Sequence, residues 1–522
     1  MSRIIRANQT QPTVLWVMLL AILLVYLSFP TRNYYWDGID FAHTIESASR
    51  VDTSLVHPNH LIYNLVGYLF YKLLRGMGTN LKAVAALQIL NSLLSASCAY
   101  VLFLILKSSL HSLYVSVCLT LLFAFSATWW RFSTDADAYV PSVFFLLISF
   151  YLILPNRKPK PFLVALTFSV AMCFHQLAIL FGPVIVLGLF LQIESRGLKE
   201  RIFTVFEFGA PAFLLTLGAY YLCFHLASGK SDLVSFFHWT TSFSPEAGGF
   251  SFNLGSDMAY TLRGHARLFF GGRINLIKGL VNPLIGLLMF VLVVVIVLFT
   301  YVVLTSFSKP SLRWLRSLQR DQQHRKLVLL SLSWFLVYLI FLFFWIPQNT
   351  FYRLFYLPAL IVLAGVVVTS STSHGAYERK YRLALFVAAV SLANFLFLIF
   401  PYSHEEKYPP LAFAREMSKA WPAGTVVYYA MDNSDNSLVR YFNPATNWKS
   451  LDSMKPAALE NELHDIYSKG AAAWLDYSAI DHLSSTPDGA AWLSRHAKQE
   501  SRRELVNQAF KIRFVQIVPD TQ

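Results

Sequence analysis

The sequence predicts an α-helical polytopic membrane protein with a small C-terminal α/β domain outside the membrane. Three observations support this fold class. Of the 522 residues, 55% are hydrophobic and only 14% are charged, whereas soluble proteins carry roughly 25% charged residues. Apolar runs that are long enough, or nearly long enough, to cross a bilayer recur through the first 400 residues. At Pro401 the composition changes sharply to that of a water-soluble segment.

Eleven apolar runs are candidate membrane helices, because a spanning helix needs about 20 mostly apolar residues. The first run follows a short basic segment and lacks a small-x-small cleavage site, so we expect a retained signal anchor rather than a cleaved signal peptide. In chain order the runs are 13–30, 83–106, 113–130, 139–154, 161–175, 177–192, 204–227, 280–305, 327–346, 355–371 and 383–400.

The basic residues predict the orientation, because Lys and Arg favour the cytoplasmic side of a membrane. They cluster at 157–160, 196–201, 309–326 and 379–382. Placing these clusters and the N-terminus in the cytoplasm gives eleven crossings and an outer, periplasmic C-terminus if the membrane is a bacterial inner membrane. The net charge of +14 is then a topology signal, and we expect no nucleic-acid partner.

One further segment, 59–75, is apolar and about one short span long. If it crossed as a twelfth helix, every later basic cluster would move outside. We therefore expect a short juxtamembrane or re-entrant helix, and about 11–12 membrane helices in all.

The predicted domains are a membrane domain, 1–400, with outer loops at 31–82 and 228–279, and a soluble domain, 401–522. The soluble domain has strand-like runs at 425–430 and 471–477. Helical and loop segments, such as 456–468 and 489–510, lie among them.

Two carboxylates follow the first apolar run. Asp37 and Asp40 are three residues apart, a spacing that puts them on one face of a helix. They could supply a general base or hold a divalent cation. The alternative is an interfacial helix end with solvated acids.

Histidines occur in two of the segments predicted to face outward. His57 and His60 flank a Pro-Asn turn, and His175 lies between two short apolar runs. Histidine can accept a proton near neutral pH or ligate a metal. The alternatives are an ordinary turn at a helix start and, for His175, a hydrogen-bonded structural residue.

A second acidic pair, Asp135 and Asp137, lies between two runs with Arg131 beside it. An Asp-x-Asp pair can bind a metal or orient a hydroxylated substrate, and it can equally cap a helix. Arg353 also lies between two runs. It could bind a lipid phosphate by a bidentate contact or anchor the chain at the headgroups.

The order of these motifs resembles that of the GT-C class of polytopic glycosyltransferases, which includes protein O-mannosyltransferases, oligosaccharyltransferases and the aminoarabinose transferase of lipid A. The matching motifs are Asp37-Gly38-Ile39-Asp40-Phe41 and His57-Pro58-Asn59-His60-Leu61-Ile62-Tyr63. The segment around Asp135 and Asp137, with Tyr139, resembles the second acidic motif of that group. The turn at His175 resembles its later histidine turn. The motifs cover about residues 30–180.

The resemblance implies a polyprenyl-phosphate-linked sugar donor and a glycan, lipid or protein acceptor on the outer face of the membrane. Asp37 would be the catalytic base. The supporting or substrate-binding residues would be Asp40, His57, His60, Arg131, Asp135, Asp137, His175 and Arg353. The absence of a Gly-rich nucleotide loop fits a donor without a nucleotide. No cofactor is certain, and a divalent cation stays open because one carboxylate can serve as a base unaided.

The main alternative is a transporter or flippase of a lipid-linked glycan or polymer precursor. Such proteins usually show paired repeats and broken helices at mid-membrane. This sequence shows no clear repeat, and its acids lie at the ends of the apolar runs. Both features favour the enzyme.

Overall fold

The computed structural model describes residues 2–194, 196–241, 253–277, 279–305, 321–370, 376–430, 434–443, 446–451, 456–506 and 511–519. The chain divides into two compact units. The first comprises Met1–Thr31 and Thr44–Pro401, and the second comprises Arg32–His43 and Tyr402–Gln522. The division after Pro401 falls at the change in composition. The assignment of 32–43 to the second unit was not expected from the sequence.

Helices build the first unit. α2 (Trp36–Ser47) runs across the division between the units. The other α-helices are α1 (Ser2–Ser28), α3 (Tyr63–Gly76), α4 (Ala83–Leu110), α5 (Leu113–Ala124), α6 (Ala127–Ser133), α7 (Tyr139–Leu152), α8 (Pro161–Phe174), α9 (Gly182–Gln192), α10 (Leu198–Ser228), α11 (Leu233–Thr241), α12 (Leu254–Phe269), α13 (Pro283–Thr305), α15 (Gln322–Trp345), α16 (Leu357–Ser370), α17 (Ala376–Asn394) and α18 (Phe400–Tyr402), whose last residue belongs to the second unit.

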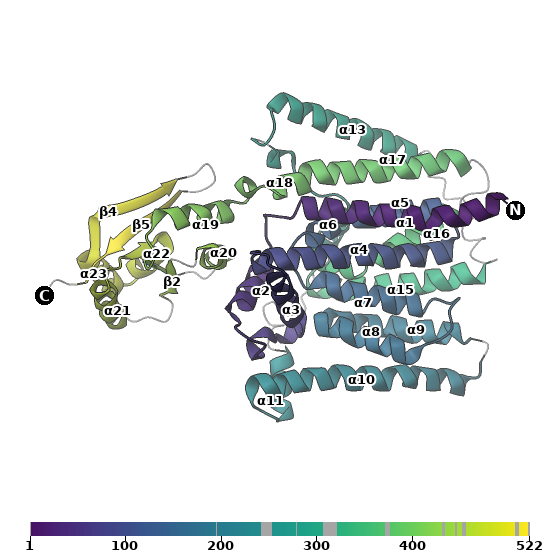
Figure 1. The fold of residues 1–522 in the computed structure, drawn as a ribbon, viewed down its shortest axis with the longest axis horizontal. Helices are drawn as coiled ribbons and strands as arrows, with labels where there is room; N and C mark the ends of the chain where they lie inside the picture. Colours follow the sequence, from purple (N-terminus) through teal and green to yellow (C-terminus); the bar gives the residue numbers. More distant parts are fainter. Residues whose placement is uncertain are drawn as a thin grey trace. The chain divides into compact units, whose positions relative to one another are not determined.

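Short tight helices connect several of these. They include η1 (Thr53–Leu55), η2 (Pro58–His60), η3 (Gln176–Phe181), η5 (Ile274–Leu276), η6 (Phe351–Phe355) and the π-helical turn η7 (Phe395–Ile399). The long helices lie side by side (Figure 1), with α10 against α8, α8 against α7, α7 against α4 and α4 against α1.

Each of the eleven apolar runs lies mostly on helix in the described part of this unit. Among the described residues, α4, α10, α15 and the segment Tyr381–Tyr402 are long and apolar enough to cross a membrane. The pair α5 and α6, bent by 66°, makes a fifth candidate. The other runs are shorter apolar helices of 10–17 residues. The chain is thus an α-helical membrane protein, and eleven crossings remain a prediction.

Three sequence predictions concern segments that either are not candidate spans or are not fully described. α3, which covers most of 59–75, is not among the described helices that meet the length and hydropathy criteria. Residues 309–320 of the third basic cluster lie outside the described residues. So do 242–252 of the predicted outer loop 228–279.

A five-stranded sheet forms the core of the second unit. Its order is β2 (Asn447–Ser450), β1 (Val426–Tyr429), β3 (Ala473–Asp476), β5 (Lys511–Ile517) and β4 (Ala497–Val506). The pairs β1–β2 and β1–β3 are parallel, and β3–β5 and β4–β5 are antiparallel. All four residues of β1 are buried, which explains its unbroken apolar sequence, because a strand covered on both faces needs no polar side.

Helices cover both faces of this sheet. On one face, Val426 and Tyr428 share a core with apolar residues of α21 (Pro456–Ser468) and α22 (Tyr477–Ser484). On the other, Phe413 of α19 (Pro409–Ala420) contacts Trp448 and Phe514. The remaining elements of the second unit are η8 (Glu405–Lys407), α20 (Ser434–Phe442) and α23 (Pro487–His496).

The sequence-based expectation for 489–510 is wrong in its second half. α23 ends at His496 and the chain continues as strand β4, with a register shift between Ala497 and Arg502. β4 lies at the edge of the sheet, where charged residues are common because they discourage pairing with other chains. Its polar sequence therefore did not indicate a strand.

Close helix contact at Gly188 gives a stability prediction. A Cβ atom at this position of α9 would lie 2.8 Å from Ile153 Cδ1, beyond the end of α7. Gly188→Ala should therefore lower stability by about 1–3 kcal/mol through overpacking. Gly218 of α10 is the matched control, because a Cβ atom there would meet nothing within 4 Å. Thermal unfolding in detergent measures both, and equal melting temperatures would contradict the packing of α9 against Ile153.

Candidate active site

Side chains of α4 hold the turn that carries the second acidic pair. Asn91 donates two hydrogen bonds from Nδ2, to the backbone carbonyls of Asp135 (2.8 Å) and Asp137 (2.7 Å). Gln88, one turn earlier, donates from Nε2 to the carbonyls of Thr31 (2.8 Å) and Thr134 (2.9 Å). Buried carbonyls require such partners, so α4 fixes both the end of α1 and the connection from α6 to α7.

The two acids of this turn are fully buried. Asp135 is 0% exposed and Asp137 is 1% exposed. Asp137 Oδ1 accepts from the backbone N–H of Tyr139 at 3.1 Å, and Asp135 Oδ1 accepts from that of Ala136 at 2.8 Å. Asp137 thus holds the start of α7 by accepting from its first N–H, one residue before the N-cap Ala138. This is close to the capping alternative that the sequence left open, and it occurs in the interior rather than at a solvated surface.

Three predicted histidines come together beside this turn. The His60 and His175 ring centroids are 4.8 Å apart, and those of His57 and His60 are 5.8 Å apart. Tyr139, at the start of α7, stands 5.1 Å from His175 and 6.3 Å from His60. From η6, Phe355 contacts His175 at 5.1 Å. We call His57, His60, His175 and Tyr139 the histidine cluster.

Hydrogen bonds fix the proton positions on these rings. His175 Nδ1 accepts from the Leu177 N–H at 3.0 Å, so the neutral ring carries its hydrogen on Nε2, which has no hydrogen-bond partner among the described residues. His60 Nδ1 lies 3.3 Å from the Phe174 carbonyl, which can only accept. His60 therefore carries its hydrogen on Nδ1.

The histidine cluster is uncharged near neutral pH. Burial lowers the pKa of His57 to about 4 and that of His60, also disfavoured by the neighbouring His57, to about 3. Burial likewise places the pKa of His175 well below its ordinary value. The cluster can therefore exchange hydrogen bonds with a ligand, but it does not supply positive charge for a phosphate.

Tyr63 links the cluster's loop to the acidic turn. It begins α3, three residues after His60, and is fully buried. Its pKa is raised well above the ordinary value by burial and, to a lesser extent, by the charges of Asp137 and Asp135. The final tyrosine of the His-Pro motif therefore lies next to the second acidic motif.

Arg353 forms a separate buried network. It is 0% exposed and donates from Nη1 to Tyr356 Oη at 3.0 Å and from Nη2 to the Pro347 carbonyl at 2.6 Å. Tyr356 Oη in turn lies 3.1 Å from His265 Nε2, on α12. A Cβ atom at Gly264 would collide with the guanidinium, so the glycine provides the space that Arg353 occupies.

The other predicted residues are Arg131, Asp37 and Asp40. Arg131, on α6, is half-buried with its guanidinium 5.7 Å from the Phe132 ring. Asp37, half-buried, and Asp40, exposed, stand in the part of α2 that belongs to the second unit. Among the described residues, no three His, Cys, Asp or Glu side chains converge as metal ligands.

Sequence reasoning missed several participants. Gln88, Asn91 and His265 lie in helices, and their partners are more than 40 residues away along the chain. Tyr356 could have been found from the sequence, because it stands three residues after Arg353, directly after η6. Tyr352 of η6 contacts His175, with the ring centroids 5.7 Å apart.

Comparison with known proteins identifies the fold. The sequence matches no protein-family model and no curated protein. Two crystal structures of ArnT from Cupriavidus metallidurans match over nearly the whole chain. The apo structure gives a TM-score of 0.60 at 12% identity, covering 99% of this chain and 100% of that one. The structure bound to undecaprenyl phosphate gives a TM-score of 0.57 at 11% identity, covering 98% of this chain and 99% of that one.

These matches confirm the predicted resemblance at the level of fold. ArnT is an aminoarabinose transferase of the GT-C class, and the present chain shares its fold over nearly the whole length of both chains. The chain is therefore an integral membrane protein with a GT-C-like fold.

Removing the Asn91 amide should loosen the acidic turn. Asn91→Leu keeps the side chain buried but leaves the carbonyls of Asp135 and Asp137 without their donor, which should cost about 1–3 kcal/mol. Thermal unfolding in detergent measures the loss. Ser97→Ala, at a half-buried position of the same helix whose hydroxyl bonds only within the helix, is the control and should melt as the wild type does. An unaffected Asn91→Leu variant would contradict this role.

Acid should destabilise the first unit through its buried histidines. Below the ordinary pKa of 6.5, the unfolded chain binds a proton at His60 that the folded chain, with its pKa of about 3, does not bind. Stability should therefore fall as the pH decreases from 6.5 toward 3, by about 2 kcal/mol for this residue between pH 6.5 and pH 5.

Melting temperatures at pH 7.5, 6.5 and 5.0 check this dependence. His60→Asn should reduce the loss on acidification. His225→Asn, at an exposed histidine near the end of α10, should leave it unchanged. The same pH dependence in His60→Asn and the wild type would exclude His60 as a source of acid sensitivity.

Proposed function

We propose that this chain is a membrane glycosyltransferase that moves a sugar from a polyprenyl-phosphate-linked donor to an acceptor on the outer face of the membrane. The observation that carries the proposal is the ArnT fold across nearly the entire chain, since one ArnT structure holds undecaprenyl phosphate. The proposed acceptor is a glycan, a lipid or a protein.

The polar groups of the first unit support this proposal. A sugar offers hydroxyl groups, and the histidine cluster and the acidic turn offer buried hydrogen-bonding groups of both kinds. We assign His57, His60, His175, Asp135 and Asp137 to substrate binding. Neutral imidazoles suit hydroxyl recognition better than phosphate binding.

The donor phosphate needs positive charge. Arg353 is always charged, and its Nε has no hydrogen-bond partner among the described residues. Arg131 is the second candidate for this role. Either guanidinium would stabilise the negative charge that develops on the phosphate as the sugar departs.

Asp37 is the proposed catalytic base. It stands in the first turn of α2, where the helix end interacts favourably with a negative charge. The acceptor hydroxyl would lose its proton to Asp37 while its oxygen forms a bond to the anomeric carbon. The bond from that carbon to the phosphate oxygen breaks, and polyprenyl phosphate leaves with the electron pair. A single displacement of this kind inverts the anomeric configuration. Asp40, on the same face, would support Asp37 or bind substrate.

We also propose the location and domain roles. The protein would reside in a bacterial inner membrane with its N-terminus in the cytoplasm. Residues 1–400 would form the membrane domain and 401–522 a periplasmic domain. The basic clusters at 157–160 and 196–201 support this orientation.

Substitution of Asp37 tests the mechanism. Purified protein is incubated with a panel of polyprenyl-phosphate monosaccharides and a bacterial envelope extract as the acceptor source, and the release of polyprenyl phosphate is measured. Asp37→Asn should slow release about 100-fold or more, the usual contribution of a general base. The control is Asp52→Asn, whose exposed carboxylate only caps a short helix and whose loss should leave the rate within about twofold.

The same assay distinguishes a glycosyltransferase from a flippase of lipid-linked sugars. Wild-type rates in Asp37→Asn would exclude Asp37 as the base. Lipid-linked sugar that moves across a reconstituted bilayer without any sugar transfer would instead indicate a flippase.

A further inference from the structure

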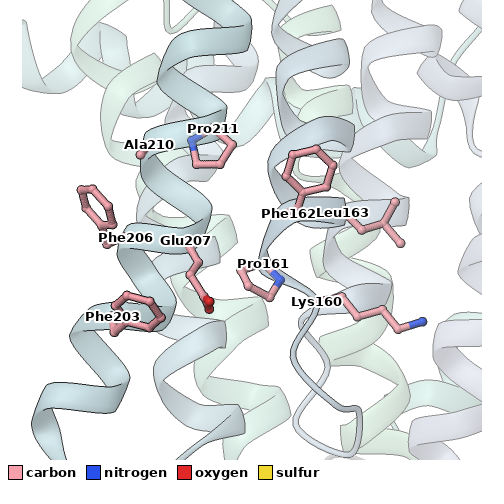
Figure 2. Close-up of a pocket in the computed structure, with 9 residues that line it drawn as sticks. All are labelled: Lys160, Pro161, Phe162, Leu163, Phe203, Phe206, Glu207, Ala210 and Pro211. Carbon is pink, nitrogen blue, oxygen red and sulfur yellow. The ribbon is translucent and has the colours of Figure 1, made fainter.

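A groove opens between the start of α8 and the first half of α10 (Figure 2), and it takes no part in the proposed reaction. Its volume is about 620 Å³. It lies at the opposite end of α8 from His175, about 20 Å away along 14 helical residues. Aromatic and aliphatic side chains form most of its lining, which consists of Lys160, Pro161, Phe162, Leu163, Phe203, Phe206, Glu207, Ala210 and Pro211.

Charged side chains of both signs border this groove. Glu207 projects between the phenylalanine rings of α10 and Pro161 (Figure 2), and Lys160 stands at the start of α8. A second cavity of about 470 Å³ adjoins the groove, since it shares Phe203 and Glu207, and its lining includes Lys199. The groove therefore offers the Glu207 carboxylate beside an apolar floor, with the Lys199 ammonium in the adjoining cavity. Lys160 borders the groove with its ammonium directed away from Glu207 (Figure 2).

These three charges differ from the other charged pair nearby. Arg196 and Glu200 form an ion pair with each other at 3.7 Å. Within the described part of the chain, Lys160, Lys199 and Glu207 form no ion pair. Unpaired charge beside apolar membrane surface is unfavourable, so a ligand that supplies the missing counter-charges would be stabilised there.

The position of Glu207 along α10 indicates how deep this side chain lies in the bilayer. From Glu207 to Ser228 the helix rises about 32 Å, close to the roughly 30 Å thickness of the hydrocarbon core. The nine residues before Glu207 extend beyond that thickness. Glu207 therefore stands where the hydrocarbon region meets the lipid headgroups, with phenylalanine side chains around it.

We propose that this groove binds one phospholipid whose headgroup carries a primary ammonium group. The ammonium N–H groups donate to the Glu207 carboxylate. The phosphate lies against Lys199 and against Lys160, whose side chain turns toward the groove when the lipid binds. The acyl chains pack along the phenylalanine side chains of the groove. An anionic phospholipid without an amine would leave Glu207 unpaired, and a basic helix of another protein would leave the two lysines unpaired. A zwitterionic aminophospholipid satisfies all three.

Native mass spectrometry of the full-length protein in detergent tests this assignment. Dioleoyl phosphatidylethanolamine, phosphatidylglycerol and phosphatidylcholine are added separately at equal concentration. We expect phosphatidylethanolamine to occupy the wild type at least fivefold more than either other lipid. Phosphatidylcholine is informative because its quaternary ammonium has no N–H to donate.

Variants at the groove give the decisive comparison. Glu207→Gln should bring the ratio of phosphatidylethanolamine to phosphatidylglycerol binding to about one. Glu200→Gln removes the same charge about two turns away, at the Arg196 ion pair, and it should keep the wild-type ratio. Because both lipids are tested on the same protein preparation, a partly unfolded fraction lowers both occupancies and does not change their ratio. Glu207→Asp should restore part of the preference.

Three results would overturn the proposal. One is equal binding of the three lipids by the wild type. Another is an unchanged ratio in Glu207→Gln. The third is a membrane protein, rather than a lipid, that co-purifies with the wild type and is lost from Glu207→Gln. None of these bears on the sugar-transfer assay, so the lipid site and the proposed enzyme activity can fail independently.

Discussion

The hydrogen bonds from Gln88 and Asn91 of α4 are the interaction on which the rest of the candidate site depends. They satisfy four backbone carbonyls in connections between apolar helices, where an unsatisfied polar group would cost several kcal/mol. By fixing the turn from α6 to α7, they also fix Tyr139 at the start of α7. The Tyr139 ring in turn packs against the rings of His60 and His175.

Among the buried groups of the first unit, the histidines are neutral and Arg353 is charged. The histidine cluster is neutral because desolvation opposes its protonation. Arg353, which is 0% exposed, supplies the positive charge, because a guanidinium stays charged in proteins. In the proposed reaction this division suits a substrate with two dissimilar parts, since hydroxyl groups require neutral hydrogen-bonding partners and a phosphate requires a cation.

The sequence predicted the features that depend on local pattern. Apolar runs predicted helices because a helix in lipid must satisfy its own backbone, and residue type alone singled out His60, His175, Asp135 and Asp137. It did not predict contacts between distant segments. Asn91 looked like an ordinary polar residue in an apolar run, because its partners lie 44 and 46 positions away. The pairing that makes 497–506 a strand, and the grouping of 32–43 with the second unit, are likewise set by distant segments.

The buried acidic turn shows why capping alone does not explain these residues. A helix cap contributes about 1 kcal/mol and works as well at a solvated surface, whereas taking a carboxylate out of water costs several kcal/mol. Asp135 and Asp137 are 0% and 1% exposed, so the hydrogen bond that Asp137 Oδ1 accepts from the Tyr139 N–H forms where a carboxylate is costly. Buried acids beside buried histidines are typical of functional sites, which agrees with the substrate-binding role proposed for this turn.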